Sequence, residues 1–274
     1  MPPSLADEIR GIAFGPDGLL YVTAIRNYAF AVLALDSSGT VRQTYPMDSV
    51  LIAGNLSYGK IAVDSQHIFV TGANQVVRFD VGSPNSGSSI YQNNQLFDVN
   101  ILPNGHLLAA SAYYIDEITT AGTLVRHISG LFTDIRGIQY DALHNDLFVA
   151  QLGDGWVLMR LDATTGAIEL RTNFWYGDDL FLTDTGSLLV GSRAVPAGIL
   201  SQDLQQIGSL GNSSQMFVTE YVPEPAMPLF FMMGALLLAY IRSRVGCRKA
   251  RKQGVQLARI HENGWREAEA QFKS

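Results

Sequence analysis

The sequence predicts an all-β protein made of a repeated sheet unit, followed by one apolar segment near the C-terminus. Three observations support this prediction. The chain has 26 glycines, 13 phenylalanines and 11 tyrosines, which fit short strands joined by tight turns. Of its 274 residues, 47% are apolar and only 16% are charged, so a packed core is expected. Apolar residues alternate with polar ones in five regularly spaced segments, as half-buried strands require.

These five segments open the repeated unit and begin alike. Each has a central apolar anchor, and successive anchors are 49, 38, 39 and 42 residues apart. Alternation around each anchor predicts the first strand of a unit. The anchors are Ile12, Ile61, Val99, Ile138 and Leu180. The predicted first strands are residues 10–14, 59–63, 97–101, 136–140 and 178–182.

Each predicted first strand is followed by a polar turn and by further strands. The turns are rich in Gly, Asn, Asp and Pro, which favour tight or left-handed backbone. The predicted second strands are residues 19–24, 68–72, 107–111, 147–151 and 188–192. The predicted third strands are residues 31–35, 76–79, 114–118, 157–161 and 198–200. Turns at residues 36–39, 119–122 and 163–166 then lead into predicted fourth strands.

Four strands per unit and a spacing near 40 residues are typical of β-propeller blades. The sequence therefore predicts a propeller of five to six four-stranded blades in residues 1–212. Segments such as Gly11-Ile-Ala-Phe-Gly-Pro-Asp-Gly-Leu-Leu-Tyr-Val22 resemble NHL-type and gluconolactonase-like propellers. No blade ends in a Trp-Asp dipeptide, so the Trp-Asp repeat family is not indicated. Residues 216–222 alternate like a further strand, which either adds an edge to blade five or completes a sixth blade that begins upstream of Met1.

The chain changes character after this body. Residues 226–241 contain no charged residue, and as a helix they extend about 24 Å against a hydrocarbon layer of about 30 Å. We predict a transmembrane helix at 226–241, lengthened by residues from Val222 onward or by snorkelling arginines. A core helix is the alternative, although residues 230–233 leave it no polar face. Residues 213–225 are then a terminal strand and linker, and residues 242–274 a basic cytoplasmic tail.

Basic residues follow the apolar segment directly and predict its orientation. Six of the eleven residues 242–252 are basic, and such clusters stay on the cytoplasmic side. Residues 1–225 carry 10 Lys and Arg against 22 Asp and Glu, a net charge of −12, whereas residues 242–274 carry 9 against 3, a net charge of +6. The acidic body is therefore expected outside the cytoplasm, with no nucleic-acid partner. The membrane-flanking basic cluster is Arg242, Arg244, Arg248, Lys249, Arg251 and Lys252.

A Val-Pro-Glu-Pro tetrapeptide at residues 222–225 separates the body from the apolar segment. Two prolines this close cannot enter a strand ladder or a helix interior, so the linker should be extended and accessible. In order, the Pro-Glu-Pro, the apolar segment and the arginine-rich cluster resemble the PEP-CTERM sorting signal over residues 222–252. The resemblance implies a Gram-negative exported protein, anchored in inner-membrane lipid and processed by an exosortase for the cell surface or the medium. The predicted sorting-motif residues, which act as a substrate, are Val222, Pro223, Glu224 and Pro225.

Several features depart from the family's pattern. Pro228 interrupts the first helical turn, Cys247 falls inside the basic cluster, and residues 253–274 extend beyond it. Residues 1–8 contain neither a basic nor an apolar leader, so we expect the true start to lie upstream or the chain to be a fragment. Cys247 is the single cysteine, which excludes an intrachain disulfide, and it is expected to be inert or acylated.

Residues that could carry chemistry are few. Gluconolactonase-like propellers bind a divalent metal through Glu, Asn and Asp residues of different blades. Acidic residues before propeller strands more often cap turns, so we predict no catalytic residue and no cofactor. A calcium-dependent lactonase or esterase is the alternative. The resemblance maps the metal set to Glu8, Asn100, Asp134 and Asp178 or Asp179.

The body is predicted to be a binding or structural module. The sequence contains no Gly-x-Ser-x-Gly elbow, phosphate loop, dinucleotide-binding motif or His-Glu-x-x-His. No two of the five histidines are two or four residues apart, and His67, His106 and His144 fall in or beside turns. Trp156, Trp175 and Tyr176 are mostly expected in the core, but stacking on sugar rings makes an extracellular polysaccharide a candidate partner.

Overall fold

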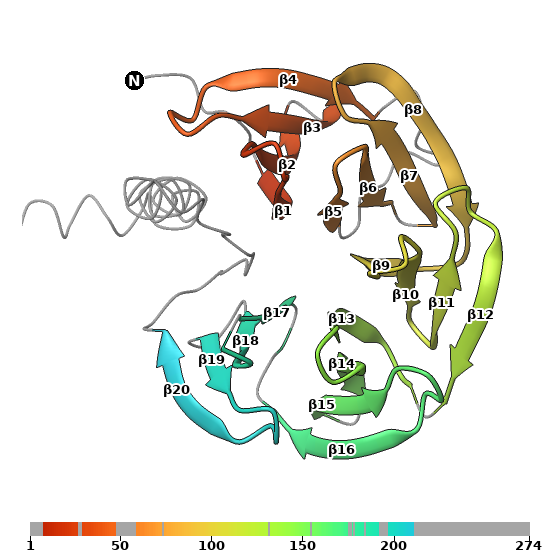
Figure 1. The fold of residues 1–274 in the computed structure, drawn as a ribbon, viewed down its shortest axis with the longest axis vertical. Helices are drawn as coiled ribbons and strands as arrows, with labels where there is room; N and C mark the ends of the chain where they lie inside the picture. The colour runs from red at the N-terminus through yellow and green to blue at the C-terminus, as the bar shows by residue number, and fades with distance from the viewer. Residues whose placement is uncertain are drawn as a thin grey trace, which may run out of the picture. The chain divides into compact units, whose positions relative to one another are not determined.

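The computed structural model describes residues 8–26, 29–47, 59–72, 74–130, 132–153, 155–174, 177, 179–183, 185–191 and 197–210. Within them, 20 strands form five antiparallel sheets of four strands, each sheet ordered as its strands follow in the chain. Figure 1 shows these sheets around a common axis, with β1, β5, β9, β13 and β17 innermost. The prediction of an all-β propeller with four-stranded blades is confirmed, and the described residues contain five of the five to six blades predicted.

The strands of each blade run consecutively along the chain. Blade 1 contains β1 (Glu8–Phe14), β2 (Leu20–Arg26), β3 (Ala29–Leu35) and β4 (Val41–Pro46). Blade 2 contains β5 (Ile61–Val63), β6 (His67–Thr71), β7 (Gln75–Asp80) and β8 (Ser83–Gln92). Blade 3 contains β9 (Leu96–Ile101), β10 (Leu107–Ser111), β11 (Tyr114–Ile118) and β12 (Leu124–Ser129). Blade 4 contains β13 (Ile135–Asp141), β14 (Asp146–Gly153), β15 (Gly155–Asp162) and β16 (Ile168–Asn173), and blade 5 contains β17 (Asp179–Leu182), β18 (Leu188–Gly191), β19 (Ala197–Leu200) and β20 (Gln206–Leu210).

The turn between β1 and β2 shows how local sequence shapes a blade. Gly18 has a φ of +77°, in the left-handed region that glycine adopts without steric cost. The Asp17 carboxylate accepts a hydrogen bond from the backbone N–H of Leu19 at 3.1 Å and from the Tyr21 hydroxyl at 2.6 Å. Because Tyr21 is fully buried, this turn is tied to the core. The polar turn predicted between the first and second strands of this unit is confirmed.

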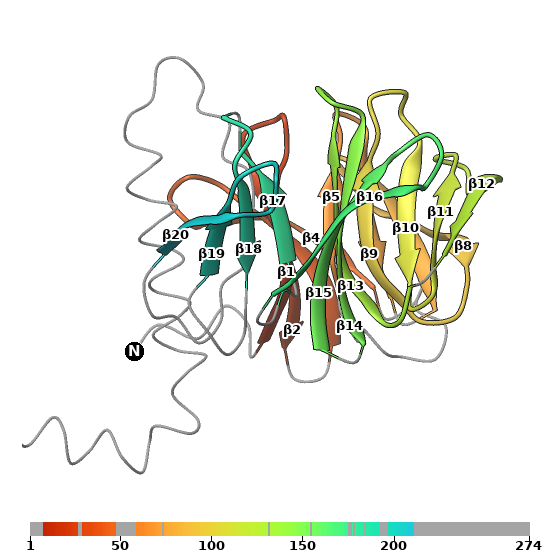
Figure 2. The same ribbon diagram turned by 90° about the horizontal axis from the view of Figure 1, so that it is seen from below.

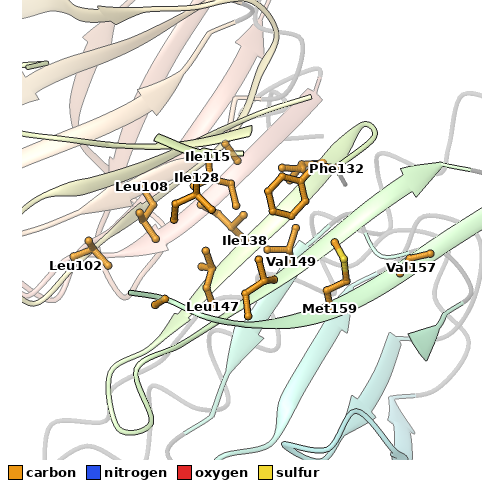
Figure 3. Packing of buried hydrophobic residues seen from close by; sticks show 14 residues of the cluster. Leu102, Leu108, Ile115, Ile128, Phe132, Ile138, Leu147, Val149, Val157 and Met159 are labelled. Carbon is orange, nitrogen blue, oxygen red and sulfur yellow. The ribbon is translucent and has the colours of Figure 1, made fainter. Parts of the chain in front are cut away.

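Apolar side chains pack between successive blades in four clusters. Leu147 and Val149 of β14 pack toward blade 3, whereas Phe148 and Ala150 of the same strand pack toward blade 5. Successive side chains of a strand point to opposite faces, so a middle strand buries both faces and is apolar throughout. Figure 3 shows the cluster between blades 3 and 4.

The described blades form an arc in chain order. The neighbouring innermost strands are β1 and β5, β5 and β9, β9 and β13, and β13 and β17. The four apolar clusters join the same successive blades. Figure 1 shows one sector, between the sheet of β17–β20 and the sheet of β1–β4, without a described blade. Residues 216–222 lie outside the described residues, so a sixth blade and an added edge strand both stay predictions.

Strand direction gives the arc two different ends. Figure 2 shows the blades from the side, with inner strands such as β9 and β10 running roughly along the axis and outer strands such as β20 inclined to it. Because consecutive strands are antiparallel, the turns after the first and third strands of every blade lie at one end. We call this the turn end of the propeller.

The observed elements differ from the predicted ones at a few places. β5 begins at Ile61 and not at residue 59, where Gly59 has a φ of +60° that does not fit a strand. The fourth strands of blades 2 and 5, β8 and β20, were not located in the sequence. β8 contains mostly small polar residues, so its alternation is weak, and β20 has only five residues.

The predicted C-terminal elements lie beyond this part of the chain. No helix within the described residues is long and apolar enough to cross a membrane. The linker at 213–225, the transmembrane helix at 226–241 and the tail at 242–274 all lie outside the described residues. They stay predictions.

Candidate functional site

Equivalent positions directly before the strand anchors meet near the propeller axis. Three of them carry charge, and all three line one cavity of about 330 Å³, which we call the cup. The other two are glycines, and a Cβ at Gly11 would lie 2.4 Å from the carbonyl oxygen of Gly59, so that position has no room for a side chain. In blades 1 to 5 these positions are Gly11, Lys60, Asp98, Gly137 and Asp179.

Lys60 and Asp179 form an ion pair between blades 2 and 5. The Lys60 Nζ lies 2.7 Å from the Asp179 Oδ1, and the two side chains are only 11% and 15% exposed. These blades are not neighbours in the arc, so the ion pair spans the axis. A pair this buried is held in one geometry and is weakly screened by salt.

Asp98 is the most buried charged group of the cup. Its Oδ1 accepts the backbone N–H of Val99 at 2.8 Å, and its Oδ2 accepts the N–H of Ile138 in blade 4 at 2.9 Å. Burial raises the pKa of the Asp98 carboxyl to about 7, with a further increase from Asp179 that Lys60 and the two amides partly offset. The group therefore changes charge near neutral pH.

The positions directly after the anchors form the wall of the cup. Two are small, two are amides and one is aromatic: Ala13, Ala62, Asn100, Gln139 and Phe181. The Gln139 amide donates to the Tyr140 carbonyl oxygen at 3.1 Å, whereas the Asn100 side chain makes no hydrogen bond within the described residues. Phe14 and Tyr140 also line the cavity, toward the turn end. The cup thus combines a charged floor, a free amide and aromatic surface.

The structure brings together only part of the predicted metal set. Asn100 and Asp179 line the cup, but Asp134 is ion-paired with Arg136 and does not line it. The Glu8 side chain and Asp178 lie outside the described part of the structure. Among the described residues, no three His, Cys, Asp or Glu side chains lie close enough to hold a metal ion. The predicted metal set therefore stays a prediction, and the Asp179 carboxylate is paired with Lys60.

The sequence analysis did not single out Lys60 and Asp98, which share the cup with Asn100 and Asp179. What could have identified Lys60 and Asp98 in the sequence is their position, because each directly precedes a strand anchor, as Asp179 does. Because side chains alternate along a strand, the residue before the anchor lies on the same face of the first strand in every blade. An alignment of the five repeats would therefore have grouped these residues.

The described histidines are paired with carboxylates at or near blade turns. His67, His106 and His144 lie in or beside the first turns of their blades, as predicted. The Nδ1 atoms lie 3.4 Å from Asp64 for His67, 2.8 Å from Glu117 for His106, 2.6 Å from Asp116 for His127 and 2.7 Å from Asp141 for His144. These contacts satisfy the polar groups of the turns and leave no histidine in the cup.

A second cavity, of about 270 Å³, lies between blades 3 and 4. Burial raises the pKa of Glu117 at its edge, but His106, Arg126 and Asn104 outweigh burial and hold that pKa below its usual range. Arg126 also donates to the carbonyl oxygens of Ala163 and Thr164 in blade 4, at 2.6 and 2.5 Å. Since these polar groups bind one another, we interpret them as part of the contact between blades 3 and 4.

The remaining predicted site residues lie outside the cup or outside the described residues. Trp156 is half-buried on β15, and Trp175 and Tyr176 lie outside the described residues. The sorting motif Val222 to Pro225 and the basic cluster from Arg242 to Lys252 also lie outside them.

Comparison with known proteins identifies the fold. No family model matches the sequence, and no curated protein matches it significantly. The WD40 β-propeller domain of Doa1 matches with a TM-score of 0.57 and 13% identity, over 74% of this chain and 68% of that chain. A streptogramin B lyase matches with a TM-score of 0.57 and 15% identity, over 75% and 69%. A protein of unknown function from Bacteroides caccae matches with a TM-score of 0.54 and 13% identity, over 74% and 81%. At these identities the matches establish a β-propeller fold and leave the activity open.

Proposed function

We propose that this chain is an exported binding protein whose propeller body holds a small ligand in the cup. The cup itself carries the binding proposal, because the innermost strands of all five blades line it. Its volume of about 330 Å³ falls within the usual range of small-molecule sites, and apolar wall with a few polar groups is their usual composition.

The sorting part of the proposal rests on the sequence. Residues 222–252 combine Pro-Glu-Pro, an uncharged apolar segment and an arginine-rich cluster in the order of a PEP-CTERM signal. We infer that the apolar segment anchors the chain in inner-membrane lipid with the body outside the cytoplasm, and that an exosortase then detaches the body. The acidic body and basic tail favour this orientation.

Processing can be tested by expressing the chain, with an added signal peptide, in cells with and without an exosortase. We expect the enzyme to shorten the chain by the mass of its C-terminal segment. Deletion of residues 223–225 should prevent this, whereas deletion of Pro2 and Pro3 should have no effect. A chain that stays uncut, or that is cut equally well without residues 223–225, contradicts the sorting proposal.

Ligand binding can be tested by a thermal-shift screen of small polar metabolites. Ala142 lines the cup and is exposed, so Ala142→Trp should obstruct the cup without disturbing the core. Ala121 is exposed in a turn outside the cup, which makes Ala121→Trp the matched control. We expect stabilising compounds to act on the wild type and the control but not on Ala142→Trp. Equal responses in all three would place binding elsewhere.

A metal-dependent lactonase or esterase is the second candidate function. It is favoured by the convergence of Asp98, Asn100 and Asp179 from three innermost strands. The ion pair of Asp179 with Lys60 weighs against it, because a cation would have to displace the lysine. A calcium-dependent rise in melting temperature together with hydrolysis of a lactone would support the enzyme, and the absence of both would remove it.

A further inference from the structure

We propose that the ligand of the cup is a small organic monocation, a primary ammonium compound held by the Asp98 carboxylate. This inference rests on the proposed binding function and specifies its ligand class. Its basis is the charge of the floor, the free hydrogen-bonding capacity around it and the aromatic wall.

The three charged groups that line the floor are two carboxylates and one ammonium. Lys60 and Asp179 neutralise one another at 2.7 Å. Asp98 is acted on by these two residues from blades 2 and 5, and blade 4 contributes the Ile138 amide. When Asp98 is ionised, these three groups together carry a net charge of −1, which one ammonium group neutralises. An anionic ligand would instead have to replace Asp179 at Lys60.

Hydrogen-bonding capacity at the floor matches an ammonium donor. A carboxylate oxygen can accept about two hydrogen bonds. Each oxygen of Asp98 accepts one, from Val99 or from Ile138, so acceptor positions remain on both. The Asn100 side chain, which makes no hydrogen bond within the described residues, adds a carbonyl oxygen beside them. A primary ammonium supplies three N–H donors for these acceptors.

The aromatic wall of the cup and the negative net charge of the body also favour a cation. Phe14, Tyr140 and Phe181 line the cavity, and aromatic faces attract cations when these are partly desolvated. Residues 1–225 carry a net charge of −12, which raises the local concentration of cations. An organic monocation with an apolar end therefore suits both the floor and the wall.

Binding of an ammonium group should be linked to deprotonation of Asp98. The ionised carboxylate is the binding form, and burial places the pKa of Asp98 at about 7 in the free protein. Affinity should therefore increase about tenfold between pH 6 and pH 8, and binding below pH 7 should release a proton. Primary amines stay protonated throughout this range.

The experiment is a calorimetric titration of the full-length chain, in a detergent without a sugar headgroup, with phenethylamine as the probe. We expect a Kd of about 1 mM at pH 8 and about 10 mM at pH 6. At pH 6, the measured heat should change with the ionisation enthalpy of the buffer, since a proton is released. Acetate, methyl glucoside and calcium chloride serve as anionic, neutral and metal probes.

Three variants separate the proposed contact from general effects. Asp98→Asn should weaken binding at pH 8 at least about tenfold and abolish its pH dependence. Asp203→Asn is the matched control, because that side chain is 83% exposed, and it should bind as the wild type does. Phe181→Leu keeps an apolar wall but removes the ring, so it should weaken binding severalfold and provides a second test should Asp98→Asn not fold.

Phenethylamine binding that is independent of pH, or unaffected by Asp98→Asn, overturns the inference. Preferential binding of acetate, methyl glucoside or calcium that Ala142→Trp blocks also overturns it, while the proposed binding function stands. Failure of every probe refutes the ammonium ligand, and only a metabolite screen that also finds nothing in the cup refutes the binding function itself.

Discussion

The ion pair between Lys60 and Asp179 joins two non-adjacent blades, and replacing Lys60 with methionine tests its contribution. Methionine is flexible and apolar, so the variant removes the charge while filling much of the space. Asp179, which is 15% exposed, then loses a partner 2.7 Å away. We therefore expect a clear loss of stability in Lys60→Met.

The size of the effect follows from burial. Removing one partner of a fully buried pair costs about 3–5 kcal/mol. Because this pair keeps some exposure to solvent, we expect Lys60→Met to lose about 3 kcal/mol of folding stability. For a body of this size, that loss lowers the melting temperature by roughly 6–12 °C. Thermal unfolding followed by circular dichroism measures it. Arg42→Met is the control, because Arg42 is 63% exposed beside Asp36, and its melting temperature should be unchanged within error.

The double variant Lys60→Met with Asp179→Leu provides the decisive comparison. Replacing both charges by apolar groups also removes the carboxylate that loses Lys60 in the single variant, so most of the lost stability should return. A Lys60→Met protein that melts within about 2 °C of the wild type would refute the structural role of the pair. So would a double variant less stable than the single one.

Three further predictions concern other features of the body. The pKa of Asp98 is about 7 in the folded state and 3.8 for an exposed carboxyl, so between these values the folded state binds a proton that the unfolded state does not. The stabilisation from this proton is therefore lost as the pH rises from about 4 to about 7, and Asp98→Asn should reduce the pH dependence of the free energy of unfolding measured by urea titration. Gly122→Ala should unfold or strongly destabilise the chain, because its Cβ would lie 1.6 Å from a carbonyl oxygen of blade 2, whereas Gly18→Ala, in open space, should cost about 1–2 kcal/mol of left-handed strain in a melting experiment. Phe148→Ala should lower the free energy of unfolding by about 3–5 kcal/mol in urea, while Leu143→Ala, at an 83% exposed site, should leave it unchanged.

Much of the fold could be predicted because the repeat is visible in its inner strands. The first three strands of each blade pack on both sides, so the residues around anchors such as Ile138 alternate or are wholly apolar. The outermost strands touch only one neighbour in their sheet and are half exposed, so the pattern of β8 and β20 was too weak to locate them. Periodicity therefore predicts buried strands better than edge strands.

The site was less predictable because its residues are far apart in the sequence. Asn100 and Asp179 were among the candidate ligands, whereas Lys60 and Asp98 were not. What joins them is the equivalent place of each residue on a different inner strand. Asp134 shows the reverse case, since it precedes an inner strand but has a φ of +60° and pairs with Arg136. The backbone conformation decides whether an acidic residue before an inner strand lines the cup, as Asp179 does, or lies outside it, as Asp134 does.

The most direct test of the cup as the ligand site is a crystal structure of the protein with a compound that stabilises it in the thermal-shift screen. We predict electron density for the compound within the inner strands, in contact with Asp98 and Asn100. Density only in the cavity between blades 3 and 4, or on the outer surface of the blades, would contradict the proposed function of the body.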